Sequence, residues 1–206
     1  MKRASIGILS RAFDITLSVG ALIFLAPLMI VVAVLVQLDG GPAFFAQGRI
    51  GRHGRIFRCL KFRSMVPDAQ ERLNELLARD PAARAEWAAT HKLRNDPRIT
   101  KLGAFLRKSS LDELPQLFNI LLGQMSFVGP RPIVPAEAER YGIHLRHYCA
   151  VRPGLTGLWQ VSGRSDVDYR TRVVMDVAYV RSKCLALDLQ ILVRTVPAVL
   201  LRRGSY

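Results

Sequence analysis

A continuous apolar run near the N-terminus is the feature that most limits how this chain can fold. Residues 15–38, ITLSVGALIFLAPLMIVVAVLVQL, contain no charged side chain. As a helix, a run of this length can cross a hydrocarbon core of about 30 Å. It is too long for the apolar core of a signal peptide. We therefore expect a membrane-inserted helix, and a buried core helix is the alternative from these residues alone.

A proline inside the run and basic residues on both flanks favour a helix that enters and leaves the membrane on one side. Pro27 lacks a backbone donor and clashes with the preceding turn, so we expect the helix to break there. Basic residues mark the cytoplasmic side, and they lie on both flanks, within 2–11 and within 49–63. The sequence thus predicts a re-entrant helix–break–helix over 1–40 and a cytoplasmic domain over 41–206, and the alternative is a single-span anchor.

The charge of the chain indicates anionic partners. The 206 residues include 30 Lys and Arg against 16 Asp and Glu, which gives a formal net charge of +14. Such a balance favours nucleic acid, acidic lipid headgroups or phosphorylated substrates. The chain has no zinc-finger or RNP-like signature, so we expect no nucleic-acid partner, and a membrane-tethered nucleic-acid binder is the weaker reading. The three cysteines form no CxxC pair and are expected to be free thiols.

The rest of the chain predicts an α+β fold that is mostly helical. Short alternating apolar stretches with glycine turns after residue 41 predict one or two strands or a hairpin. A glycine-rich segment over 152–164 predicts a loop with close backbone approach. The C-terminal segment 187–203 is amphipathic, and it either packs on the domain or lies on the membrane surface. Helices are expected at 67–79, 81–91, 101–108, 114–121, 136–141 and 169–181.

Two adjacent acids stand out in this basic chain, Asp112 and Glu113. One interpretation is structural, because Ser110-x-x-Glu113 fits a capping box at the start of an apolar helix. The other is chemical, because a carboxylate among arginines stays ionised and can attack phosphorus or bind magnesium. Arg107 and Arg131 lie close in sequence and can bind phosphate oxygens in a bidentate fork. The spacing alone leaves both interpretations open.

Five stretches together resemble a known family. They are the apolar run, KFRSM (61–65), NDPRIT (95–100), LRKSSLDELPQLFNILLGQMSFVGPRP (106–132) and RPGLTGLWQVSGR (152–164). With these motifs the chain resembles the bacterial sugar transferase family, the monotopic phosphoglycosyl transferases that start exopolysaccharide and O-antigen assembly. The similarity runs over nearly the whole chain. Because the chain begins almost at the membrane segment, it resembles the short form of the family.

The resemblance implies a reaction. Such enzymes transfer a sugar-1-phosphate from a UDP-sugar to a polyprenyl phosphate, usually undecaprenyl phosphate, and release UMP. By similarity, Asp112 attacks the sugar-bearing phosphorus to form a covalent aspartyl phosphosugar, which the polyprenyl phosphate then attacks. Glu113 would handle a proton or position the acceptor. Mg²⁺ would bridge the diphosphate with Asp112 as a ligand. The sequence does not identify the sugar.

Further site residues follow from the resemblance and from charge. Arg107 and Arg131 match arginines that bind phosphate in the family. Lys61, Arg152 and Arg164 are assigned to phosphate or nucleotide contacts because they are basic and belong to the motifs. Trp159 is either a stacking partner for uracil or a core residue, and core packing is the more common role.

The resemblance also implies a location and partners. The family's membrane element is a re-entrant helix broken at a proline, although Ala26 stands where some relatives have the serine of a Ser-Pro pair. We expect the bacterial inner membrane, with the catalytic domain facing the cytoplasm. The expected partners are the UDP-sugar, the polyprenyl phosphate and anionic membrane lipids, and homo-oligomerisation is left open. The alternative function is a non-catalytic scaffold of a polysaccharide assembly complex.

Overall fold

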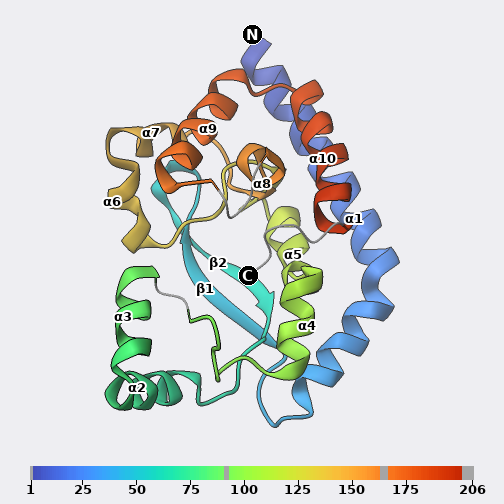
Figure 1. Ribbon diagram of the computed structural model, residues 1–206. Coiled ribbons are helices and arrows are strands. Elements are labelled where there is room, and N and C mark those ends of the chain that lie inside the picture. Colours follow the sequence, from blue (N-terminus) through green and yellow to red (C-terminus); the bar gives the residue numbers. More distant parts are fainter. Residues whose placement is uncertain (1, 91–92, 163–166, 201–206) are drawn as a thin grey trace.

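The computed structural model describes residues 2–90, 93–162 and 167–200, and it is mostly helical with two small sheets. The long helix α1 (Lys2–Gln37) runs along one side of the molecule (Figure 1). The other α-helices of the described residues are α2 (Ala69–Arg79), α3 (Pro81–Thr90), α4 (Lys101–Ser109), α5 (Gln116–Leu121), α6 (Ala138–Tyr141), α7 (Leu145–Tyr148), α8 (Leu158–Ser162), α9 (Tyr169–Ser182) and α10 (Leu185–Leu200). Helices predicted from the sequence therefore form close to their expected bounds.

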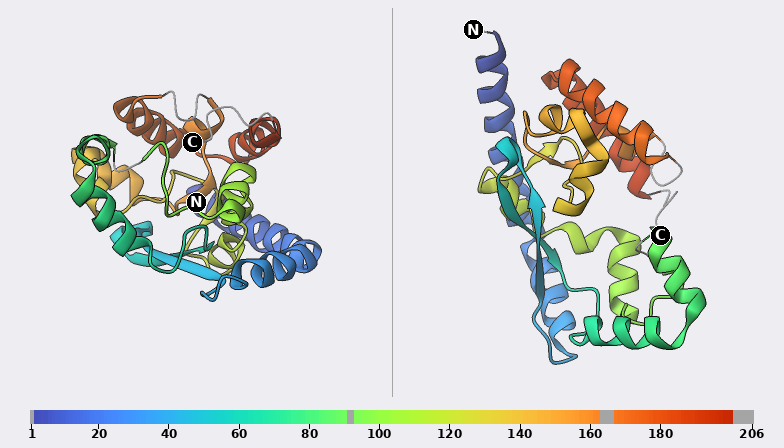
Figure 2. Two further views of the ribbon diagram at one scale, coloured as in Figure 1. Left: turned by 60° about the horizontal axis from the view of Figure 1, so that its bottom comes forward. Right: turned by 90° about the vertical axis from the view of Figure 1, so that its left-hand side faces the viewer.

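The predicted hairpin is confirmed. Strand β1 (Phe44–Ile50) pairs antiparallel with β2 (Ile56–Phe62), and the short turn η1 (Arg52–Gly54) joins them. The hairpin and α1 form one side of the molecule, whereas α3 and α9 lie on the opposite side (Figure 2). The hairpin and α1 thus lie side by side on one face of the rest of the domain.

The segment expected as a glycine-rich loop is more regular than predicted. It contains strand β4 (Gly154–Thr156), which pairs in parallel with β3 (Ser126–Val128), followed by α8. The close backbone approach is confirmed, because a Cβ atom on Gly154 would lie 2.1 Å from the backbone nitrogen of Gly129. The glycines therefore permit two strands to pair closely here, and this is why their pattern looked like a loop.

Helix α1 bends where the sequence predicted a break. It is continuous from Lys2 to Gln37 with Pro27 inside it, so the two separate helices of the prediction are not formed. Its axis turns near the middle, and the outside of the bend points away from the domain (Figure 1). Proline removes one hydrogen bond and crowds the preceding turn, which is enough to kink a helix without ending it.

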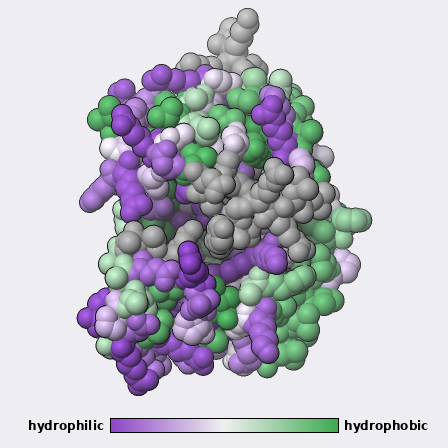
Figure 3. Space-filling model, in the orientation of Figure 1, coloured by the Kyte–Doolittle hydropathy of each residue, from purple (hydrophilic) through white to green (hydrophobic). Residues whose placement is uncertain are grey.

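The outer face of α1 is apolar and exposed. Ile23 and Phe24, near the bend, are 74% and 83% exposed. Hydrophobic residues cover this side of the molecule (Figure 3). By length and composition, residues 7–37 could cross a membrane. An apolar surface of this extent is unusual for a protein face in water and marks a membrane or protein contact.

The inner face of α1 packs on the domain along both halves. In the first half, the buried Asp14 accepts hydrogen bonds from the Ser126 hydroxyl at 3.0 Å and from the backbone nitrogen of Phe127 at 3.1 Å. In the second half, Val32 and other apolar side chains of α1 pack against Phe62 and Leu106, which are almost fully buried. Each such buried side chain contributes about 1.5–3 kcal/mol. Helix α1 is therefore part of the fold as well as its apolar surface.

A buried arginine fastens the C-terminal end of α1 to the end of β2. Arg63 donates to the carbonyl oxygens of Val36 at 2.8 Å and Pro42 at 2.7 Å, and it forms an ion pair with Asp39. It also donates to the Met65 carbonyl at 2.9 Å. The segment that follows α1 is thus held at the end of β2, where the KFRSM motif begins.

Helix α10 packs on the domain, which was one of the two readings of the C-terminal segment. Its Ile191 belongs to the main core together with Met125 and Tyr179. Its outer side still exposes Val193 and Val196.

Candidate active site

The two acids lie in a tight turn between α4 and α5. Helix α4 begins at Lys101 and ends at Ser109, and it is capped by Thr100, whose hydroxyl accepts from the backbone nitrogen of Gly103 at 2.8 Å. Ser110 then adopts a left-handed conformation with φ 59°, which only glycine takes up without strain. The 3-10 turn η2 (Leu111–Glu113) follows and carries both acids. A strained residue beside a pair of acids points to a functional turn.

The predicted capping box is not formed. The Ser110 side chain makes no capping hydrogen bond at η2, and the Glu113 side chain bonds to a lysine from another element. The reason is the left-handed backbone of Ser110, which differs from the extended backbone of an N-cap residue. Capping therefore does not explain the two acids.

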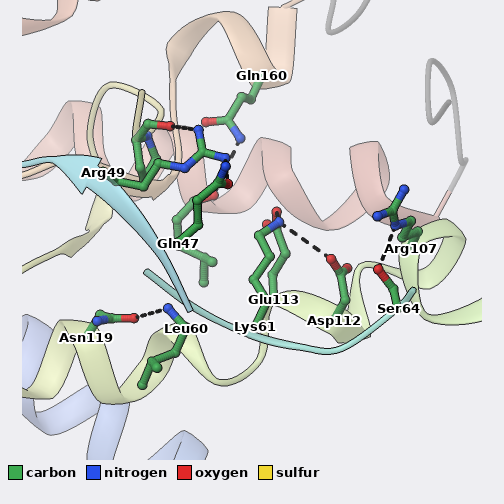
Figure 4. Close-up of polar contacts among 12 residues, drawn as sticks. Gln47, Arg49, Leu60, Lys61, Ser64, Arg107, Asp112, Glu113, Asn119 and Gln160 are labelled. Carbon is green, nitrogen blue, oxygen red and sulfur yellow. Dashed lines mark hydrogen bonds and ion pairs between the residues drawn. The ribbon is translucent and has the colours of Figure 1, made fainter. Parts of the chain in front are cut away.

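A lysine from β2 lies between the two carboxylates (Figure 4). The Lys61 ammonium is 2.6 Å from Glu113 Oε1 and 3.5 Å from Asp112 Oδ2. Asp112 is 7% exposed, and Glu113 is half-buried. The KFRSM motif and the acidic motif, about fifty residues apart in the sequence, thus meet at this site.

A buried amide on α5 sets the position of β2. Asn119 Oδ1 accepts from the backbone nitrogen of Leu60 at 2.9 Å, and its Nδ2 donates to the Arg58 carbonyl at 2.8 Å. Asn119 therefore satisfies the free edge of β2 next to Lys61. The sequence reading missed this residue. The one available signal was a polar side chain within the apolar pattern of the helix.

The two acids differ in their electrostatic environment. Burial raises the pKa of Asp112, and the Glu113 charge adds to this, whereas Lys61 and Arg107 oppose it. Burial also acts to raise the pKa of Glu113, but Lys61 and Arg131 outweigh it and the net pKa is lowered. Glu113 is thus a stronger acid than an ordinary glutamic acid, whereas Asp112 is a weaker acid than an ordinary aspartic acid. Paired carboxyls with divergent pKa values are typical of catalytic sites.

A small pocket opens beside Glu113 and is rich in cations and amides. Arg131, predicted from the sequence, is exposed at this pocket, and Arg49 donates to the Pro132 carbonyl at 2.9 Å. Sequence reasoning missed Arg49. Its signal was the period of two along the hairpin, because Arg49 and Lys61 lie on the same face of the paired strands. The amides Gln116 and Gln160 also line the pocket and were missed.

Arg107 lies on the other side of Asp112. Its Nε donates to the Ser64 hydroxyl at 2.8 Å, so a second residue of the KFRSM motif helps to position the site. Its charge is close enough to oppose the rise in the pKa of Asp112. Asp112 thus has basic side chains on two sides.

The comparisons with known proteins give the family. The model of the family described as bacterial sugar transferase matches residues 6–202. The chain belongs to this family. The resemblance inferred from the motifs is therefore confirmed.

Several curated relatives of this sugar transferase are named for their substrates or pathways. It is 58% identical, over 96% of its length, to the undecaprenyl-phosphate galactose phosphotransferase of Salmonella typhimurium, of which it spans 42%. It is 52% identical, over 97% of its length, to the exopolysaccharide production protein ExoY of Sinorhizobium fredii, of which it spans 89%. It is 40% identical, over 95% of its length, to the undecaprenyl-phosphate glucose phosphotransferase of Komagataeibacter xylinus, of which it spans 36%. The chain thus covers less than half of some relatives and most of another.

The structure does not bring every predicted residue of this sugar transferase to the acids. Arg152 bonds to the Gly123 carbonyl at 2.8 Å and lies near Arg11 and Arg52, and it does not line the pocket beside Glu113. Trp159 is buried, with the Arg172 guanidinium 4.7 Å from its ring centre, so it is a core residue. Arg164 lies outside the described residues.

The donors of this sugar transferase fit a magnesium ion that is shared with the substrate. Among the described residues, no group of three or more His, Cys, Asp or Glu side chains could hold a metal ion. Magnesium in phosphate-transferring sites, however, is usually bound by one or two carboxylates together with substrate phosphates. The carboxylate of Asp112, with Glu113 beside it, would be the protein's ligand in such an arrangement.

Proposed function

We propose that this sugar transferase moves a sugar-1-phosphate from a UDP-sugar to undecaprenyl phosphate and releases UMP, as the first step of exopolysaccharide or O-antigen assembly. The observation that carries the proposal is the pair Asp112 and Glu113 around Lys61, with Arg49, Arg107 and Arg131 at the rim. Both substrates are polyanions, and positioning and charge neutralisation are the main tasks in phosphoryl transfer. The names of the relatives support the same reaction.

The reaction takes place in two displacements at phosphorus. In the first, a carboxylate oxygen of Asp112 bonds to the sugar-bearing phosphorus, and the bond from that phosphorus to the bridging oxygen breaks, so that UMP leaves with the electron pair. In the second, a phosphate oxygen of undecaprenyl phosphate bonds to the same phosphorus and the aspartyl oxygen leaves. Asp112 is regenerated, and the product is a lipid-linked diphosphosugar.

The opposite pKa shifts of Asp112 and Glu113 suit a nucleophile and a neighbouring charged group. The raised pKa of Asp112 accompanies a more basic and more nucleophilic carboxylate, once it is ionised. The lowered pKa of Glu113 keeps its charge at neutral pH, where it can hold Lys61 or orient the acceptor phosphate. When magnesium is bound, it supplies charge neutralisation of the diphosphate next to Asp112.

We infer that α1 is the re-entrant membrane element, although it bends instead of breaking. Near its start, Arg11 donates to the carbonyl oxygens of Ile120 at 2.6 Å and Leu121 at 2.7 Å, and its far end is fastened by Arg63. Both ends are therefore attached to one polar domain, while the exposed bend points outward. In a bacterium this arrangement corresponds to the inner membrane with the domain in the cytoplasm.

The experiment that tests the function measures UMP release from a panel of UDP-sugars. The purified full chain is incubated with undecaprenyl phosphate and magnesium, and UDP-galactose comes first because relatives named for galactose are 58% and 50% identical. Asp112→Asn should lower UMP release at least about a thousandfold. Asp68→Asn, at an exposed acid on the first turn of α2, is the matched control and should keep activity.

The outcomes separate the alternatives. Without acceptor, wild type should release at most one UMP per protein and gain the mass of one phosphosugar. No release from any donor by folded, membrane-bound protein favours the scaffold. Release that survives Asp112→Asn retains the transferase but removes Asp112 as the nucleophile.

A further inference from the structure

A second cavity lies between the first half of α1 and the turn of the hairpin. It has a volume of about 590 Å³ and is lined by the guanidinium side chains of Arg11, Arg52 and Arg152 and by Ile8 and Ile15 of α1. None of its lining residues lines the pocket beside Glu113. Its residues come from the first half of α1, from the turn η1 and from the segment before β4. The function proposed above leaves this cavity unused.

Part of the hydrogen-bonding capacity of these arginines is used within the protein. Arg11 donates to the last carbonyls of α5, and the Nε of Arg152 donates to the Gly123 carbonyl. These bonds cap the C-terminal end of α5. In the part of the chain that the structure describes, the Nη groups of Arg152 and the whole Arg52 side chain make no hydrogen bond. The cavity therefore has free donors in a fork geometry.

In the described part of the chain, no acid lines the cavity to balance its positive charge. Burial lowers the pKa of Arg152, and the charges of Arg11 and Arg52 lower it further, while Asp14 opposes this. The Asp14 carboxylate is already held by Ser126 and Phe127. Three cations thus share one acid that has other partners. An anion in this cavity would relieve their mutual repulsion.

The residues that line the cavity indicate which kind of anion it can bind. Guanidinium groups bind phosphate through paired hydrogen bonds, and the cavity lies in the size range of about 300–1,000 Å³ that suits organic ligands better than bare ions. Among the described residues that line it, none is aromatic and none offers a stacking surface for a nucleotide base. Its other wall is the apolar face of α1, with Ile8 largely exposed. A phosphate that carries hydrocarbon chains can bond to the arginines and pack its chains against the apolar face of α1.

We propose that this cavity binds the phosphate of an anionic membrane phospholipid, with the acyl chains lying along the exposed face of α1. The cavity stands at the N-terminal end of the apolar run, where a helix inserted in a bilayer meets the phosphate layer. The bound lipid fixes the depth of α1 and screens the three arginines. The proposal goes beyond the sugar transfer, because it uses none of the residues assigned to that reaction in the active site.

The test compares two arginines in the same turn. Full-length protein in a neutral detergent is titrated with phosphatidylglycerol, and binding is measured by native mass spectrometry and by thermal stabilisation. Arg52→Gln should weaken binding about fivefold, the effect of one interfacial arginine. Arg55→Gln removes the same charge from the same turn, but Arg55 does not line the cavity, so binding should stay at the wild-type level. Phosphatidylcholine should bind neither variant above background.

Other ligands test the source of the phosphate. Equal weakening by Arg52→Gln and Arg55→Gln would indicate diffuse charge attraction and overturn the proposal. Inorganic phosphate that stabilises as well as phosphatidylglycerol would overturn the role of the apolar wall. Undecaprenyl phosphate that displaces phosphatidylglycerol from wild type but not from Arg52→Gln would reassign the cavity to the acceptor. Asp112→Asn should bind phosphatidylglycerol normally, so the outcome is independent of transferase activity.

Discussion

Lys61 lowers the pKa of both carboxyls of the site. Its ammonium contacts Glu113 closely and Asp112 more loosely, so a single positive charge acts on both acids. Burial raises the pKa of Asp112, and Lys61 is the largest effect that opposes this rise. A nucleophilic carboxylate must be ionised, so Lys61 determines how far into acidic pH the site keeps its nucleophile.

Replacing Lys61 should move the acid limb of the activity profile. In Lys61→Gln the opposing charge is lost and the pKa of Asp112 rises further. Activity then falls at a higher pH than in wild type as the solution is acidified. The measurement is kcat/KM for UMP release as a function of pH, with Lys61→Arg as the control that keeps the charge.

Two results would decide the role of Lys61. An acid limb that moves up in Lys61→Gln and returns in Lys61→Arg fits a residue that sets the ionisation of Asp112. A lower kcat/KM with an unmoved acid limb would limit Lys61 to a substrate contact.

Individual site residues could be predicted where a motif carried them. Asp112, Glu113, Lys61 and Arg131 belong to motifs, and the structure brings them together. Arg49 depends on strand register, which a sequence shows only after the hairpin is paired. Arg152 was assigned by its charge and by its motif, but neither tells which way a side chain points. Hence motif membership located the centre of the site and missed part of its rim.

At the scale of elements, the contact of α6 with α9 contains a buried acid that titrates near neutral pH. The Tyr141 hydroxyl donates to Asp176 Oδ2 at 2.7 Å, and Asp176 Oδ1 has no hydrogen-bond partner among the described atoms. Burial raises the pKa of Asp176 to about 7, although the Tyr141 bond opposes the rise. Two helices that pack near the Ile50 end of the hairpin thus meet at a carboxyl that prefers to be neutral.

This carboxyl should make the stability of the fold depend on pH. The folded pKa lies above the ordinary value of 3.8, so the stabilising contribution is complete below about pH 4 and is lost as pH rises through about 7. The loss amounts to about 4 kcal/mol when Asp176 is fully ionised. Asp176→Asn cannot ionise, so its unfolding temperature should vary less between pH 5 and 8. Thermal unfolding followed by circular dichroism in detergent measures both slopes.

The control for this prediction is Asp168→Asn, which removes an exposed acid from the N-terminus of the same helix. It should keep the wild-type slope over this range. Identical slopes for wild type and Asp176→Asn would contradict the assignment of the titration to Asp176.

Helices and strands were predicted well where a single sequence pattern dominated a segment. Helices α2, α4 and α9 formed close to their predicted ranges, and the hairpin followed from alternation between glycine turns. The segment 152–164 was misjudged because its glycines serve strand pairing, which depends on a partner strand far away in the sequence. The break at Pro27 was wrong because packing of both halves of α1 on the domain keeps the helix continuous.

For the whole molecule, the path of α1 decides on which side of the membrane its two ends lie. A helix attached to one domain at both ends cannot place those ends on opposite faces of a bilayer while the domain stays on one side. We therefore expect the two ends of α1 to be accessible from the cytoplasm and its bend to be shielded by lipid.

Cysteine accessibility tests this topology. In a background without the natural cysteines, Ser5→Cys and Leu38→Cys should react with a membrane-impermeant maleimide in inside-out vesicles and remain unreacted in intact spheroplasts. Ile23→Cys, at the bend, should remain unreacted in both until detergent is added. Labelling of the two ends from opposite sides would establish a spanning helix and refute the re-entrant path.

The end of β2 and the residues after it connect α1 to the two acids of the candidate site. Lys61 reaches the acids, Arg63 holds the end of α1, and Ser64 holds Arg107. Protein engineers often obtain a soluble enzyme by deleting its membrane helix. Here deletion would release Arg63 from its carbonyl partners and leave the neighbouring lysine without a fixed strand. A water-soluble form is better sought by replacing the exposed side chains around Ile23 and Phe24 with polar ones while the inner face of α1 is kept.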